Sequence, residues 1–203
     1  MAQRVVTRTL INLADIPKFG TSALGNRISL WKGDITSLKV QCIVNDVNTD
    51  FSKPKAVTRV INKNGGHGLI NDYSRLKRCP VGKAVIGCGF DLPCDYVIHT
   101  ASPVVSYTRI HATEEDATKL KECYAESMSL CAKKGIKSVA FPCLGTRSHR
   151  YPLEEASKVE AEELIRSLSE NATVERVILC TQSDAEMNII KGALENALKN
   201  IEG

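Results

Sequence analysis

Two segments of this chain place polar side chains directly after apolar runs. The first follows CIVN and begins with Asp46, and the second follows VAFP and continues from Gly145 to Arg150. Carboxylates and amides can hold a base or a sugar by hydrogen bonds, and arginine can hold a phosphate. Ligands of open α/β sheets bind beyond the carboxyl ends of the strands, so we expect both loops to border one cleft.

Short apolar runs alternate with helical patterns along the chain. Several runs are almost entirely apolar, which is typical of central strands that are covered on both faces. The predicted strands are Ile28–Trp31, Cys42–Asn45, Ala84–Cys88, Tyr96–Thr100, Val139–Pro142 and Val177–Thr181. The predicted helices are Ala117–Lys134 with Gly135 as C-cap, Leu153–Ser169, and a last helix from Asp184 as N-cap to Ile201. This alternation predicts an α/β fold with a mostly parallel or mixed sheet between helical layers.

The composition is that of one globular domain. A chain of 203 residues can bury one well-filled core, and 43% hydrophobic with 25% charged residues is ordinary. The formal net charge of +4 permits an acidic partner, but composition alone favours a solvated surface. No apolar run approaches the roughly 20 residues that cross a bilayer, so we expect no membrane association. We also expect a monomer.

The N-terminal segment and the cysteines bear on the cellular compartment. The segment MAQRVVTRTL is basic but lacks the long apolar core of a secretory signal, and a mitochondrial presequence is the alternative. The eight cysteines form no CxxC pair and the four histidines are not spaced as zinc partners, so we expect neither metal nor cofactor. Cysteines inside apolar stretches, such as Cys42 and Cys180, are typical of buried thiols in a reducing compartment. We therefore expect a cytoplasmic protein, with the nucleus and the mitochondrion as alternatives.

Three ordered segments resemble the macrodomain family, in particular its MacroD type. They are WKGDIT followed by CIVND, VGKAVIGCGFDLPCDYVIHTASP at residues 81–103, and SVAFPCLGT at residues 138–146 followed by Tyr151-Pro152. The lead-in LINLADIPKF is similar to the N-terminal extension of the MacroD branch. The resemblance implies a three-layer α/β/α macrodomain with a central mixed sheet over residues 26–203, after an N-terminal extension of residues 1–25. It also implies a site for ADP-ribose or an ADP-ribosylated protein.

The resemblance assigns the two ends of that site. Asp34 would accept a hydrogen bond from the adenine amino group, and Ile35 would offer a backbone amide. Asn45 and Asn48 keep the two asparagines of the family's Asn-Ala-Ala-Asn stretch and would line the ribose side. The family loop around the diphosphate corresponds to Gly145, Thr146, Arg147, Ser148 and His149.

Both nucleotide-cradling loops depart from the family pattern. The glycine run of the first loop reads Lys53-Pro54-Lys55-Ala56, and the catalytic acid and histidine positions are Thr58 and Asn62. Threonine is a poor general base near neutral pH, and the loss of a positioned base costs about 10²–10⁴ in rate. Both interior glycines of the second loop are arginines, Arg147 and Arg150, and Thr181-Gln182-Ser183 replaces an aromatic that stacks on adenine.

Three hypotheses follow. The first is a pseudoenzyme that binds ADP-ribose or a related nucleotide and has lost hydrolysis. The second is an active hydrolase of ADP-ribosylated protein or O-acetyl-ADP-ribose, with a carboxylate from Asp46 or Asp50, although both are also interpreted as solvated loop acids. The third is a module for RNA or another polyanion, since both loops carry basic residues: Lys53, Lys55, Arg59 and Lys63 in the first, and Arg147, His149 and Arg150 in the second. We expect His99 to be a hydrogen-bonded core histidine.

Overall fold

The computed structural model describes residues 9–54 and 56–202. The strands are β1 (Ile11–Asn12), β2 (Ile28–Lys32), β3 (Leu38–Lys39), β4 (Cys42–Asp46), β5 (Ala84–Cys88), β6 (Tyr96–Thr100), β7 (Ser138–Pro142) and β8 (Arg176–Thr181). The helices are α1 (Val57–Leu76), α2 (Glu114–Lys134), α3 (Leu153–Glu170) and α4 (Asp184–Glu202), with short 3₁₀ turns η1 (Leu13–Asp15), η2 (Gly25–Arg27) and η3 (Ile35–Ser37). All six predicted strands are confirmed to within one residue at each end.

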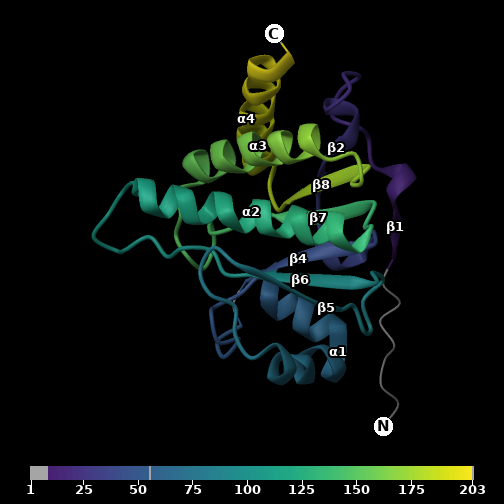
Figure 1. The fold of residues 1–203 in the computed structure, drawn as a ribbon, viewed down its shortest axis with the longest axis vertical. Helices are drawn as coiled ribbons and strands as arrows, with labels where there is room; N and C mark the ends of the chain where they lie inside the picture. The colour runs from purple at the N-terminus through teal and green to yellow at the C-terminus, as the bar shows by residue number, and fades with distance from the viewer. Residues whose placement is uncertain (1–8, 55, 203) are drawn as a thin grey trace.

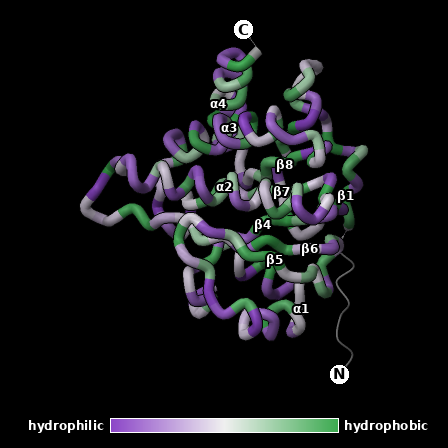
Figure 2. Tube along the Cα trace, in the orientation of Figure 1, coloured by the Kyte–Doolittle hydropathy of each residue, from purple (hydrophilic) through white to green (hydrophobic). Residues whose placement is uncertain are grey.

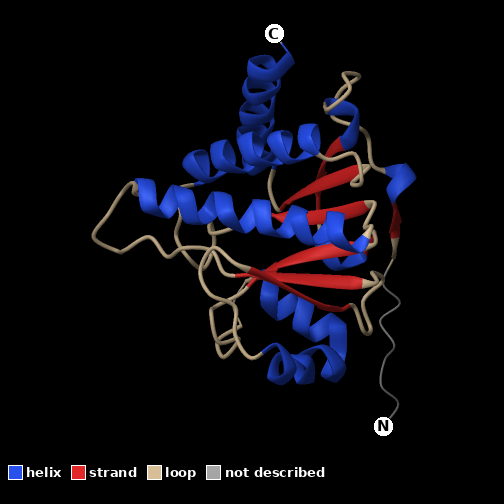
Figure 3. Ribbon diagram, viewed as in Figure 1, coloured by secondary structure: helices blue, strands red, loops and turns tan. Residues whose placement is uncertain are grey.

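Six strands form one sheet in the order β2-β8-β7-β4-β6-β5 (Figure 3). Neighbouring strands are parallel except at the edge, where β5 runs antiparallel to β6. The predicted mixed sheet is therefore confirmed. Because β2, β8, β7 and β4 are parallel to one another, the carboxyl ends of all four strands lie along the same side of the sheet.

Alternate residues of each central strand enter different cores. Val44 and Phe141 pack with α2, α3 and α4 on one face, whereas Ile43 and Ala140 pack with Ile61 of α1 on the other. The helices therefore form outer layers on opposite faces of the sheet, as expected for an α/β/α architecture (Figure 1). Hydrophobic residues follow the central strands along the chain trace (Figure 2). No helix of the described part of the chain is long and apolar enough to cross a membrane.

Local signals explain most helix ends. Helix α2 starts three residues before its predicted start because Thr113 and Asp116 form a capping box. Gly135 ends it at φ +69°, as predicted. The N-cap prediction at Asp184 is wrong by one residue: α4 already includes Asp184, and Ser183 Oγ accepts the amide N–H of Glu186 at 3.2 Å.

Helix α1 is absent from the sequence prediction. It contains three glycines in VTRVINKNGGHGLINDYSRL, and glycine is a weak helix former. Gly66 interrupts the helix at φ +73°, and a Cβ there would lie 2.0 Å from Asp91 Oδ2. This kink lets two short helical pieces cover one face of the sheet.

The described part of the N-terminal extension is packed against the domain. Strand β1 pairs with β3, and Ile16 is buried beneath the sheet's α1 side. Arg176 of β8 donates to the Ile16 carbonyl at 2.6 Å, and the Ser29 hydroxyl of β2 donates to the Pro17 carbonyl at 2.7 Å. The boundary at residue 25 stays a prediction, and residues 1–8, which include most of the basic MAQRVVTRTL segment, lie outside the described residues.

Candidate functional site

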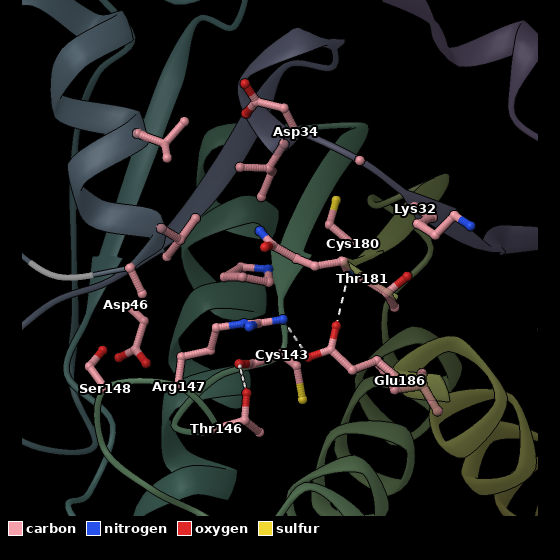
Figure 4. A pocket seen from close by; sticks show the side chains of 18 residues that line it. Lys32, Asp34, Asp46, Cys143, Thr146, Arg147, Ser148, Cys180, Thr181 and Glu186 are labelled. Carbon is pink, nitrogen blue, oxygen red and sulfur yellow. Dashed lines mark hydrogen bonds and ion pairs between the residues drawn. The ribbon is translucent and has the colours of Figure 1, made fainter. Parts of the chain in front are cut away.

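A cavity of about 590 Å³ lies at the carboxyl ends of β2, β4, β7 and β8 (Figure 4). Its walls come from the loops after these strands and from the first turns of α1 and α4. The lining residues are Lys32, Gly33, Asp34, Ile35, Asp46, Ala56, Val57, Val60, Pro142, Cys143, Thr146, Arg147, Ser148, Cys180, Thr181, Gln182, Glu186 and Ile190. The expected cleft between the two loops is therefore present and open.

Asp34 and Ile35 line one end of the cavity, next to β2. Asp34 is the N-cap of η3, and its Oδ1 accepts from the amide of Thr36 at 2.9 Å and from the Thr36 hydroxyl at 2.8 Å. Neither bond uses Oδ2. The carboxylate is thus oriented by its own turn at the mouth of the cavity.

The loop after β7 forms the opposite end. Gly145 has φ +80°, and a Cβ there would lie 3.1 Å from the Tyr151 Cβ, so glycine suits this turn. Arg150 has φ +59° despite its side chain. Its guanidinium donates to the Val105 carbonyl at 2.7 Å and covers the Tyr107 ring, away from the cavity.

Arg147 reaches across the cavity to α4. Its Nη2 donates to Glu186 Oε1 at 2.6 Å, and the dashed line in Figure 4 marks this pair. The other oxygen of Glu186 accepts the amide N–H of Gln182 at 2.8 Å. The arginine is therefore neutralised by an internal carboxylate.

Asp46 is the acidic residue at the end of β4, and it is buried although it lines the cavity. Oδ1 accepts from the Ser102 hydroxyl at 2.7 Å and lies 3.3 Å from the Ser102 amide nitrogen. Oδ2 accepts from the Gly145 amide at 2.9 Å and lies 3.4 Å from Nδ1 of His149. Burial would raise the pKa of this carboxyl, but His149, Ser102 and Gly145 outweigh burial and hold the pKa below its ordinary value. The interpretation of Asp46 as a solvated loop acid is therefore wrong.

A family model described as Macro domain matches residues 44–160. The chain belongs to the macro domain family. It is 36% identical over 172 residues to mouse ADP-ribose glycohydrolase MACROD1, with 84% of this chain and 52% of the mouse protein covered. It is 32% identical over 163 residues to a macro domain-containing protein of Chlorobaculum tepidum, with 80% and 92% covered.

The fold is shared with solved macro domains. The Trypanosoma brucei macrodomain in complex with ADP-ribose has a TM-score of 0.84 at 24% identity, with 92% of this chain and 77% of that chain covered. The chain spans about half or less of the length of the MACROD1 and MACROD2 relatives that head the comparison.

The two asparagines of this macro domain lie outside the cavity lining. Asn45 is buried, and its Nδ2 lies 3.2 Å from Nδ1 of His99. Burial lowers the pKa of His99 to about 4, so the ring is neutral, as expected for a core histidine. Asn48 is bonded to Asp50 and Ser52, and its side-chain oxygen accepts from the Lys53 amide at 3.2 Å. The ribose contacts of both asparagines stay predictions.

The two positions where the resemblance implies an acid and a histidine, Thr58 and Asn62, are engaged in internal contacts. The Thr58 hydroxyl is buried and donates to the Asp46 carbonyl at 2.6 Å. The Asn62 side-chain oxygen accepts from the Tyr73 hydroxyl at 2.5 Å. Neither side chain lines the cavity of this macro domain.

The basic residues of the two loops do not converge on the cavity. Among the described residues of that set, Arg147 alone lines it, and Glu186 neutralises that side chain. Arg59 donates to the Pro54 carbonyl, and His149 faces Asp46. Lys55 lies outside the described residues. The expectation that these cations face one cleft is therefore not met.

One residue that lines the cavity keeps a glycine-like backbone without a glycine. Ala56 precedes α1 with φ +43° and ψ −122°, a region that residues with a Cβ rarely adopt. The family resemblance implies a glycine run at this point, whereas this chain has an alanine at a backbone conformation that suits glycine. Strain of this kind costs about 1–3 kcal/mol.

We expect Ala56→Gly to stabilise the macro domain by about 1 kcal/mol, since relief of strain exceeds the added entropy of the unfolded chain. The free energy of unfolding measured in urea checks this. Ala185→Gly is the matched control, because Ala185 is an exposed alanine of α4, and it should cost about 0.5–1 kcal/mol. If Ala56→Gly and Ala185→Gly lower the free energy of unfolding by the same amount, the backbone at Ala56 is unstrained.

The sequence did not lead us to predict a buried polar network that lies beneath the cavity. Glu160 of α3 is fully buried, and the Tyr124 hydroxyl donates to its Oε1 at 3.0 Å. The same hydroxyl accepts from the Leu144 amide at 3.1 Å, where the loop after β7 begins. A signal was available, because Glu160 lies four residues from Ala156 and from Leu164 on the apolar stripe of α3.

Proposed function

We propose that this protein binds ADP-ribose or a related adenine nucleotide and has lost hydrolysis. The open cavity carries the proposal, because it has a preformed carboxylate, Asp34, at one end and the loop from Gly145 to Ser148 at the other. MACROD1 is named as an ADP-ribose glycohydrolase, and the Trypanosoma brucei macrodomain was solved with ADP-ribose. These relatives support the choice of ligand.

The chemistry of the described lining residues favours binding over hydrolysis. Thr58 and Asn62 supply neither a carboxylate nor an imidazole at the positions where the resemblance implies them. Asp46 is the carboxylate of this loop that lines the cavity, but its oxygens are occupied by Ser102 and Gly145. A carboxylate with a lowered pKa is a weak base, so Asp46 is poorly suited to activate water.

The test combines calorimetry with a turnover assay. ADP-ribose should bind to the purified protein, and Asp34→Asn should weaken binding by about tenfold because an acceptor oxygen becomes a donor. The matched control is Asp95→Asn, which removes an exposed acid outside the cavity lining and should leave binding unchanged. Steady release of ADP-ribose from an ADP-ribosylated substrate would refute the loss of hydrolysis. Absence of binding would refute the proposal as a whole.

A further inference from the structure

The loop after β7 already binds a negatively charged group, which is the carboxylate of Asp46 in the same chain. The Gly145 amide, at a positive-φ turn ahead of α3, donates to Asp46 Oδ2 at 2.9 Å. Backbone amides in such turns are the donors that proteins use to bind phosphates. Asp46 is buried and yet lines the cavity, so its charge faces whatever enters this end.

The cations of the lining are already paired. Arg147 bonds Glu186 at 2.6 Å, and Lys32 bonds Asp184 at 2.7 Å. The lining residues of the described chain include three carboxylates, from Asp34, Asp46 and Glu186, against these two cations. A diphosphate entering here therefore has to displace an internal ion pair and approach a buried negative charge.

Because Asp46 is desolvated, its charge repels an incoming anion more strongly than a charge on the surface would. Its carboxylate has several donors that keep it ionised near neutral pH. A charge repels a second anion more strongly in a partly buried site than in water, because the effective dielectric constant is lower. A ligand without phosphates avoids this repulsion and still reaches Asp34 at the other end.

We propose that Asp46 determines specificity in this cleft by taking the place of a ligand phosphate, so that the site recognises the adenosine part of ADP-ribose and gains no affinity from the diphosphate. This inference rests on the proposed function and states which part of its ligand supplies the affinity. The adenine end supplies the affinity, and the diphosphate of ADP-ribose adds none. Removal of the Asp46 charge should therefore restore phosphate recognition without altering the adenine end.

The experiment measures dissociation constants for adenosine, ADP and ADP-ribose by calorimetry at pH 7.5. The wild-type protein should bind ADP-ribose no more tightly than adenosine. Asp46→Ala should tighten ADP-ribose and ADP by about tenfold or more, which corresponds to about 1.4 kcal/mol, and change adenosine less than twofold. A general loss of structure would weaken all three ligands, so the ratio between ligands separates specificity from stability.

Two further variants make the test robust. Asp46→Asn removes the charge and keeps an acceptor oxygen for Gly145 or Ser102, so it carries the test if Asp46→Ala fails to fold. Asp95→Asn removes the same charge from an exposed residue outside the cavity lining and should leave all three constants unchanged. Thermal unfolding of each variant confirms that folded proteins are compared.

The outcomes distinguish this inference from the proposed function. A wild-type protein that prefers ADP-ribose over adenosine by tenfold overturns the inference and leaves the proposed function standing. If the ratio of the dissociation constants for ADP-ribose and adenosine is unchanged in both Asp46 variants, the inference is also overturned and the proposed function still stands. If neither the wild-type protein nor any variant binds these ligands, the proposed function fails and the inference fails with it.

Discussion

Replacement of Glu160 by glutamine is expected to stabilise this macro domain by about 2 kcal/mol at pH 8. Burial raises the pKa of the Glu160 carboxyl from 4.5 to about 8, and the Tyr124 hydroxyl only partly offsets this. The folded state therefore binds a proton that the unfolded chain releases. Glutamine is uncharged at every pH, and its side-chain oxygen can still accept the hydrogen bond that the Tyr124 hydroxyl donates. Its amide nitrogen replaces Oε2, which has no hydrogen-bond partner among the described residues.

The same group sets a pH dependence of stability. Because the folded pKa is raised, the contribution of Glu160 is fully present below pH 4.5 and is lost as the pH rises through about 8. The slope from one such group is at most about 1.4 kcal/mol per pH unit. The Glu160→Gln variant should lack this decline, which chemical denaturation from pH 5 to pH 9 would reveal.

Glu162→Gln is the matched control, since Glu162 is an exposed residue of the same helix. It should leave both the stability at pH 8 and its pH dependence unchanged. A wild-type protein whose stability does not fall relative to Glu160→Gln between pH 5 and pH 8 would contradict the assignment. The result also bears on the site, because Tyr124 joins Glu160 to the Leu144 amide at the start of the loop after β7.

Thr58→Asp should destabilise the protein by about 3 kcal/mol and should not create hydrolysis. The substitution inserts the acid that the family resemblance implies at this position. In this chain, however, the Thr58 hydroxyl is buried and donates to the Asp46 carbonyl at 2.6 Å. A carboxylate accepts hydrogen bonds and cannot donate one, so it would be buried against an acceptor. The acid would also stand next to a segment that already holds the buried Asp46 charge.

Two control variants separate charge from volume. Thr58→Ser keeps the donor and should cost less than about 1 kcal/mol, whereas Thr58→Asn adds similar volume to aspartate without a charge and should fall between the two. Urea denaturation gives the stabilities, and release of ADP-ribose from an ADP-ribosylated protein gives the activity. A Thr58→Asp protein as stable as the wild type would contradict the burial argument, and steady turnover by this variant would show that hydrolysis needs only this acid.

The sheet was largely predictable from local sequence, and the reason is physical. Runs such as CIVND and VILCT are apolar on both sides of the strand, and only a sheet covered on both faces buries them. Helix α1 was not predictable in this way, because its glycines weaken the helical pattern. Its kink at Gly66 depends on the approach of Asp91, which comes from a different part of the chain.

The candidate site also contains residues that could be predicted from local sequence and residues whose roles could not. Of the nine predicted ligand contacts, five line one cavity, because short motifs after strands carry their own geometry: Asp34, Ile35, Thr146, Arg147 and Ser148. The other four lie outside its lining: Asn45, Asn48, Gly145 and His149. The roles of Asp46, Glu186 and Glu160 depend on partners that are remote in sequence. Asp46, for example, bonds Ser102 and Gly145, which lie 56 and 99 residues further along the chain.

The sequence by itself determined the fold class, the strands, the loops that border the cleft, and the presence of Thr58 and Asn62 where the family resemblance implies an acid and a histidine. These features follow from local patterns of hydrophobicity and from residue identity at each position. Only the tertiary structure decided that Arg147 is neutralised by Glu186 and that Asp46 is a buried charge at the loop after β7. Burial and charge pairing arise from contacts between distant segments, so no local pattern contains them.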